Sequence, residues 1–334
     1  MMFRCSYPLI VLLDLLQYLH LHLYVLVVPL PYLYMQALSA LKNVNFLFLP
    51  VLSSNPTANP SAPYYNFQPD TSFLGNCQPL VFFAAIFGTA YLLIFFLSKR
   101  CNKIKCLRTR SKQIYKSRMR YSFIHEIFYY TVYYVFFIAV YQFTGNNADL
   151  PSSAGNLAAA VIVMIVYAAW LLWVVYLGSK FRKKIDAIPK KYQFLVYEES
   201  QFPMEIPLRA LFKVVVGLVL ISGEVSVQLI LLMVFNLIYL IYTACYAPSK
   251  KMLTNALNIF LMAGLILIEI ILFAYSTTAM STDQQNIFSV ILLSIMGTLV
   301  VTVLVWILYR FIVYIREDVM GIKPVEVEDK PKES

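Results

Sequence analysis

Acidic and amide side chains inside apolar stretches are the residues of this sequence that could do chemistry. Asp14 lies in the apolar segment 7–28, and Glu269 lies in the apolar segment 255–275. A carboxylate in hydrocarbon is costly unless it meets water, a cation or a hydrogen-bonding partner, so it marks either an ion path or a paired structural contact. The residues of this kind form a candidate polar pathway: Asp14, Gln17, Glu126, Gln228, Asn255, Asn258 and Glu269.

Two interpretations of these polar side chains stay open. In the first, they line a path for a proton or another ion. In the second, they form hydrogen bonds between helices, worth about 1 kcal/mol each, that hold a bundle together. The second gains weight because we expect no basic partner deep in a span: Arg209 and Lys213 should extend toward the inner surface from the start of a short span.

The sequence contains no motif typical of an enzyme. It has three histidines and ten glycines, and it lacks a zinc-protease, nucleophile-elbow, P-loop or dinucleotide signature. His20 and His22 point about 200° apart on a helix, so they cannot bind one metal from the same face. We therefore expect no catalytic residue, no metal and no cofactor, and we interpret the chain as a protein other than an enzyme.

The elements that must position the polar side chains are membrane spans. With 60% hydrophobic and 13% charged residues, the chain has too little polar surface for a soluble globule. The sequence predicts an all-α, polytopic integral membrane protein with about eight transmembrane helices, since about 20 apolar residues cross a bilayer. The predicted spans are residues 7–28, 80–97, 121–143, 156–177, 208–221, 225–246, 255–275 and 287–312.

Two features of the last part of the chain complete this organisation. In the last predicted span, Ser294, Thr298 and Thr302 repeat every four residues, and small residues at this spacing let helices approach closely. Residues 317–334 are charged and contain proline, so we expect a disordered cytoplasmic tail after the membrane domain of residues 1–316.

The segment 99–120 contains ten Lys or Arg and no acid, and it fixes the predicted orientation. Basic residues beside a span stay on the inner side of the membrane, and eight spans place every Lys and Arg except Lys42 there. We expect contacts with anionic lipid headgroups and no binding of nucleic acid. The expected headgroup contacts are Lys99, Arg100, Lys103, Lys105, Arg108 and Arg110. Cys101 and Cys106 lie among these charges, where free thiols are expected and S-palmitoylation is the alternative.

Three segments carry a resemblance to a known family. They are residues 12–50, ending in PLPYLYMQALSALKNVNFLFLP, residues 121–134 (YSFIHEIFYYTVYY), and PLRALF followed by VQLILLMVFNLIYLIYTACYAPSKKMLTNALNIF. These segments are similar to the membrane portion of ciliate surface proteins with cysteine-rich repeats, which in turn resembles the fungal TRP-like multi-pass proteins. That family is associated with calcium signalling and membrane transport. We expect three departures from that family: no cysteine-rich ectodomain, a start at the family's second span, and His125 where the family often has arginine.

The function predicted from these observations is a TRP-like channel or transport-related role, with cations as the expected cargo. The alternative is a non-catalytic structural subunit or anchor of a larger membrane assembly, at the cell surface or in the mitochondrial inner membrane. The plasma membrane is the favoured location. The expected partners are membrane lipids and either a homo-oligomer or a larger membrane complex.

Overall fold

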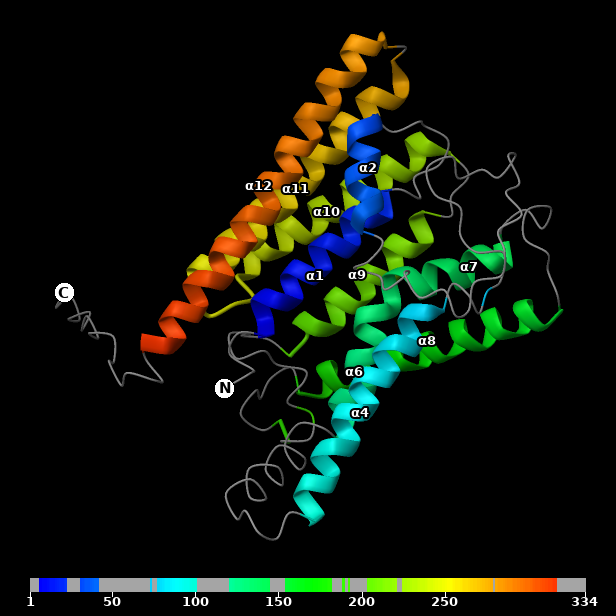
Figure 1. The fold of residues 1–334 in the computed structure, drawn as a ribbon, viewed down its shortest axis with the longest axis vertical. Coiled ribbons are helices and arrows are strands. Elements are labelled where there is room, and N and C mark those ends of the chain that lie inside the picture. Colours follow the sequence, from blue (N-terminus) through cyan, green and yellow to red (C-terminus); the bar gives the residue numbers. More distant parts are fainter. Residues whose placement is uncertain are drawn as a thin grey trace.

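The computed structural model is mostly helical in the part of the chain that it describes (Figure 1). It describes residues 6–22, 31–41, 73, 77–100, 120–144, 154–181, 188–189, 192, 203–220, 224–278 and 280–316. No strand occurs within these ranges. The helices are α1 (Ser6–Leu21), α2 (Tyr32–Ala40), α4 (Gln78–Arg100), α6 (Arg120–Thr131), the π-helical segment η5 (Val132–Phe136), α7 (Phe137–Thr144), α8 (Ala154–Phe181), α9 (Glu205–Val219), α10 (Val225–Tyr246), α11 (Met252–Thr277) and α12 (Thr282–Tyr314).

Five of these helices are long and apolar enough to cross a membrane: α4, α8, α10, α11 and α12. They coincide with five predicted spans and confirm an α-helical membrane protein. The other three predicted spans are represented by shorter helices, of which those at residues 8–21 and 124–140 are apolar. At 1.5 Å per residue, the 16 residues of α1 and the 15 of α9 extend about 24 and 22 Å, less than a hydrocarbon core of about 30 Å. The third is the continuous run of α6, η5 and α7, which the π-helical turn interrupts.

The helix α1 joins two groups of helices (Figure 1). In the first group, α11 packs against both α10 and α12. In the second group, α6, η5, α7, α8 and α9 pack against one another, and α4 packs on α6. Because α1 contacts α12 and α2 on one side and η5 on the other, its side chains can reach both groups.

The turn between α10 and α11 is held by Asn255, and this gives one predicted pathway residue a local role. Asn255 Oδ1 accepts a hydrogen bond from the Ser249 N–H at 2.9 Å, and its Nδ2 donates to the Ser249 carbonyl at 2.8 Å. Ala247 ends α10 in the left-handed region, with φ 43°. The Asn255 amide therefore binds the backbone of the turn that follows α10, and its place in a polar pathway stays a prediction.

The close contact between α11 and α12 is made at a glycine of α11. A Cβ atom added to Gly264 would lie 2.5 Å from Leu299 Cδ2, and Leu299 is buried. The predicted packing face of α12 does not make this contact. Ser294 and Thr298 are exposed, and with Thr302 they donate hydrogen bonds to carbonyls one turn earlier in their own helix.

A valine at position 264 should therefore destabilise the protein by about 1 to 3 kcal/mol, because overpacking forces neighbouring side chains out of place. Gly297→Val is the matched control, since a Cβ at Gly297 has no atom within 4 Å. Thermal unfolding of the detergent-solubilised protein measures the difference. Equal melting temperatures for the two variants would contradict the close packing of α11 on α12.

Candidate functional site

A buried ion pair between α1 and α9 forms one half of the site. Lys213 Nζ donates a hydrogen bond to Asp14 Oδ1 at 2.6 Å, and the Lys213 side chain is only 2% exposed. The same ammonium group donates to the Tyr129 carbonyl at 3.0 Å. Tyr129 returns to the pair through its side chain, since its hydroxyl donates to Asp14 Oδ2 at 2.9 Å. Both oxygens of the Asp14 carboxylate are therefore hydrogen-bonded.

Aromatic rings complete the surroundings of Lys213. Its Nζ lies 3.8 Å from the centre of the Tyr129 ring and 4.8 Å from that of Tyr133, within the range of cation–π attraction. Tyr133 belongs to η5, and a π-helical turn of this kind is frequent at functional sites. These contacts compensate for much of the hydration that the ammonium group loses on burial.

The expectation that Lys213 extends toward the inner membrane surface is wrong. Lys213 is buried against Asp14, and Arg209, one turn earlier, is buried and donates to Glu205 Oε1 at 3.2 Å. The related expectation of no basic partner deep in a span fails for the same reason. An ammonium group with a carboxylate, a carbonyl and two aromatic rings around it does not need to reach the surface.

The other half of the site joins α1 to α10 and α11. Tyr18, one turn after Asp14, donates its hydroxyl hydrogen to Glu269 Oε1 at 2.5 Å. Asn236 Nδ2 donates to the same Glu269 oxygen at 2.6 Å and to the Tyr18 hydroxyl oxygen at 2.7 Å. All three side chains are buried. They form a closed polar cluster that ties three helices together.

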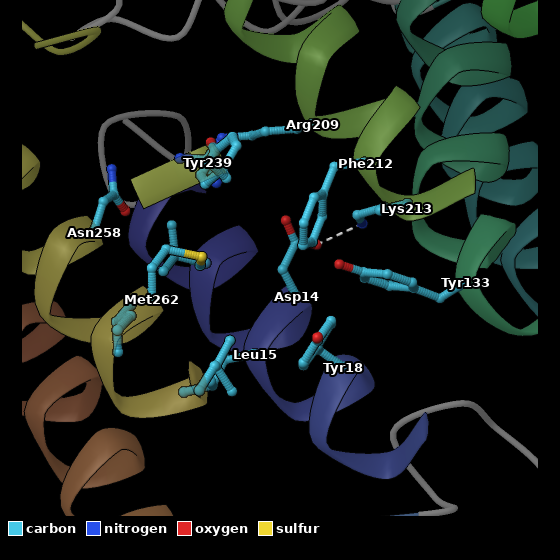
Figure 2. A pocket seen from close by; sticks show the side chains of 13 residues that line it. Asp14, Leu15, Tyr18, Tyr133, Arg209, Phe212, Lys213, Tyr239, Asn258 and Met262 are labelled. Atoms are coloured by element: carbon cyan, nitrogen blue, oxygen red, sulfur yellow. Dashed lines mark hydrogen bonds and ion pairs between the residues drawn. The ribbon is translucent and has the colours of Figure 1, made fainter. Parts of the chain in front are cut away.

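A cavity of about 50 Å³ lies between the two halves. One water molecule needs about 10 to 15 Å³ by the same measure, so the cavity has room for a few. Figure 2 shows the side chains of Asp14 and Lys213 pointing toward each other, with the Tyr133 ring beside them. The lining residues come from α1, η5, α9, α10 and α11: Val11, Asp14, Leu15, Tyr18, Tyr133, Arg209, Phe212, Lys213, Tyr239, Asn258, Leu261, Met262 and Leu265.

The candidate polar pathway is thus only partly brought together. Asp14 and Asn258 line the cavity, and Glu269 meets it through Tyr18. Gln17 instead donates to the Tyr130 carbonyl at 2.8 Å. Gln228 donates to the Leu220 carbonyl at 2.7 Å and so closes the end of α9. Both glutamine side chains donate to backbone carbonyls, and neither lines the cavity. Their place in a polar pathway stays a prediction.

Glu126 and the predicted lipid contacts lie away from this cavity. Glu126 is half-buried on α6 and is not one of the lining residues. Lys99 and Arg100 end α4, but their side chains lie outside the described residues, as do Lys103, Lys105, Arg108, Arg110, Cys101 and Cys106. The predicted tail, residues 317–334, lies outside them as well. Across the described ranges, no three His, Cys, Asp or Glu side chains are grouped so that they could hold a metal ion.

Sequence reasoning missed the residues that complete the site. Tyr18, Tyr133 and Asn236 are polar side chains in predicted spans, but such side chains are common in this sequence. Lys213 had a signal that could have been used, because it is a charged residue within an otherwise apolar stretch of α9. A lysine inside a span needs an acidic partner, and Asp14 is an acid inside another predicted span.

The helices and the buried site define the class of protein: a multi-pass α-helical membrane protein with an ion pair and a polar cluster around Glu269 inside its bundle. Comparison of the chain with protein-family models, with curated proteins and with solved structures finds no match.

Proposed function

We propose that this protein transports a cation across the membrane and that Asp14 binds the cation on its way. The Asp14 carboxylate carries this proposal, because it lines the cavity and is the less buried partner of the ion pair, at 15% exposure against 2% for Lys213. An acid that faces a cavity inside a helical bundle is the usual mark of an ion path. The resemblance to TRP-like multi-pass proteins supports the same class of function.

Lys213 can control whether a cation binds to Asp14 at the proposed site. In the described state its ammonium group occupies Asp14, so an incoming cation has to displace it. Tyr133, Tyr239 and Asn258 also line the cavity, and we propose that their side-chain oxygens help to coordinate a cation. A cavity of about 50 Å³ is too small for a continuous water-filled pore. We interpret the structure as a closed state of a transporter or a gated channel.

The proposal extends to topology and surroundings. We propose that α1, the α6–η5–α7 run and α9 also cross the membrane, which gives eight spans with the five long helices. The α6–η5–α7 run covers residues 120–144, and 25 residues at the α-helical rise extend at most about 37 Å. We further propose that the basic segment 99–120 contacts anionic lipid headgroups and that the protein resides in the plasma membrane.

Flux measurements on the purified protein in liposomes test the proposal. We expect the wild-type protein to carry Na⁺, K⁺ or Ca²⁺ into vesicles loaded with ion-sensitive dyes. Asp14→Asn combined with Lys213→Met should lower that flux at least tenfold, because it removes the acid without leaving an unpaired charge. Asp283→Asn is the matched control, since Asp283 is an exposed acid in the first turn of α12. No flux above protein-free vesicles, or full flux in the double variant, would overturn the proposal.

A second candidate function is a structural subunit or anchor within a larger membrane assembly, formed with other chains or with copies of this one. The observation that favours it is the closed cluster of Tyr18, Asn236 and Glu269, in which polar groups bind one another and hold three helices together. In that case the same variants should change stability alone, and reconstituted wild-type protein should carry no ion.

A further inference from the structure

Glu269 has an unusual set of partners for a buried acid. The side chain has no exposed surface, and both of its hydrogen bonds arrive at Oε1, from Tyr18 and from Asn236. The second oxygen, Oε2, is buried and has no hydrogen-bond partner among the described residues. Asn236 Oδ1 is also buried without a partner. Oε1 of Glu269 is therefore well hydrogen-bonded, whereas Glu269 Oε2 and Asn236 Oδ1 are two buried acceptors without a donor among the described residues.

No cation compensates a charge on Glu269 in the described part of the chain. The side chains around it are neutral: Tyr18 from α1, Asn236 from α10, and Tyr34 from α2, whose hydroxyl is 3.3 Å from His22 Nδ1. The ammonium group of Lys213 is bound to Asp14. On α12, which packs against α11, the titratable residues lie near the two ends: Asp283, Tyr309, Arg310 and Tyr314.

We propose that Glu269 binds a proton in this state and that the proton is the cation coupled to transport. This proposal rests on the proposed transport function and adds the proton as the ion that is coupled to the carried cation. An ionised carboxylate without a counter-charge is strongly disfavoured in an apolar interior, whereas the neutral acid is not. The neutral acid keeps Oε1 as the acceptor of both existing hydrogen bonds and carries its proton on Oε2. Binding is a simple addition, in which the carboxylate and a proton give the carboxylic acid.

Tyr18 is the positioning residue that links this acid to the cavity. Its hydroxyl binds Glu269, while its ring stacks on Phe212 at 6.1 Å and meets the edge of the Tyr133 ring at 6.1 Å. Tyr18 itself lines the cavity that Asp14 and Lys213 share. A rotation of Tyr18 away from Glu269 would therefore open the acid to cavity water, which can accept its proton.

Labelling with dicyclohexylcarbodiimide tests the proposal on the full-length protein in detergent. This apolar reagent takes the proton of a carboxylic acid onto its nitrogen, and the carboxylate oxygen then bonds to the central carbon. We expect mass spectrometry of the wild-type protein to find the adduct on Glu269 at neutral pH and at least tenfold less at high pH. Glu269→Gln should remove this adduct, whereas Asp283→Asn should leave it unchanged. The comparison of neutral and high pH uses only the wild-type protein, so it is decisive even if a variant misfolds.

Tyr18→Phe separates a positioning role from simple packing. It removes a donor that stabilises the ionised acid, so labelling of Glu269 should persist to higher pH than in the wild type.

Absence of the adduct at neutral pH, or its suppression by Na⁺ at constant pH, would overturn the proton assignment. Labelling reports protonation without flux, so a labelled protein that carries no ion contradicts only the proposed function. An active protein that is never labelled contradicts only this inference.

Discussion

Lys213→Met should destabilise the protein by about 3 to 5 kcal/mol, because it leaves the Asp14 carboxylate buried without its counter-charge. Methionine has a similar length and packs well against aromatic rings, so it keeps the contacts with Tyr129 and Tyr133. The loss should therefore come from charge and hydrogen bonding, with little contribution from a cavity. Unfolding in mixed detergent micelles measures the free energy, and Lys250→Met, in the exposed turn before α11, is the control.

A double-mutant cycle of Asp14 and Lys213 tests whether the loss of stability comes from their ion pair. Asp14→Asn alone should also destabilise, since it leaves the Lys213 ammonium group buried beside a neutral amide. The combination of Asp14→Asn with Lys213→Met should recover most of the loss, because neither charge remains and an apolar substitute for a buried pair is often neutral in stability. A coupling free energy near zero in this double-mutant cycle would show that the two side chains do not form the ion pair.

The helical class and the long spans could be predicted because they depend on local sequence. Long apolar runs such as the one in α12 identify themselves by length and composition alone. Asp14 and Glu269 could also be identified as interior residues, because an acid in an apolar run has few acceptable environments. These two acids are the centres of the two halves of the site.

The partners of these acids could not be predicted, because they are distant in the chain. Lys213 is separated from Asp14 by 199 positions, and Glu269 is separated from Tyr18 by 251. Helical periodicity reports which residues share a face of one helix, and it says nothing about which helix packs on that face. For the same reason Asn255 was grouped with Glu269, although its position at the start of α11 lets it bind the backbone of the preceding turn.

The side of the membrane on which residues 182–204 lie shows whether the shorter helices also cross the membrane. If only the five long helices cross the membrane, residues 182–204 lie on the side opposite to the turn between α10 and α11. If α1, the α6–η5–α7 run and α9 cross as well, residues 182–204, that turn and the segment 99–120 share one side. The segment 180–213 contains eight Lys or Arg and four acids, which favours the shared, inner side.

Labelling of single cysteines should therefore give an all-or-none pattern. In a background without the five native cysteines, Ser200→Cys and Lys250→Cys should react with a membrane-impermeant maleimide from the same side. Thr278→Cys, in the exposed segment between α11 and α12, should react only from the other. Reaction of Ser200→Cys and Thr278→Cys from one side would leave α9 outside the set of spans. With the expected pattern, α9 enters from the inner side at Glu205 and places Lys213 about 12 Å along its axis, so that the ion pair with Asp14 lies well inside the membrane.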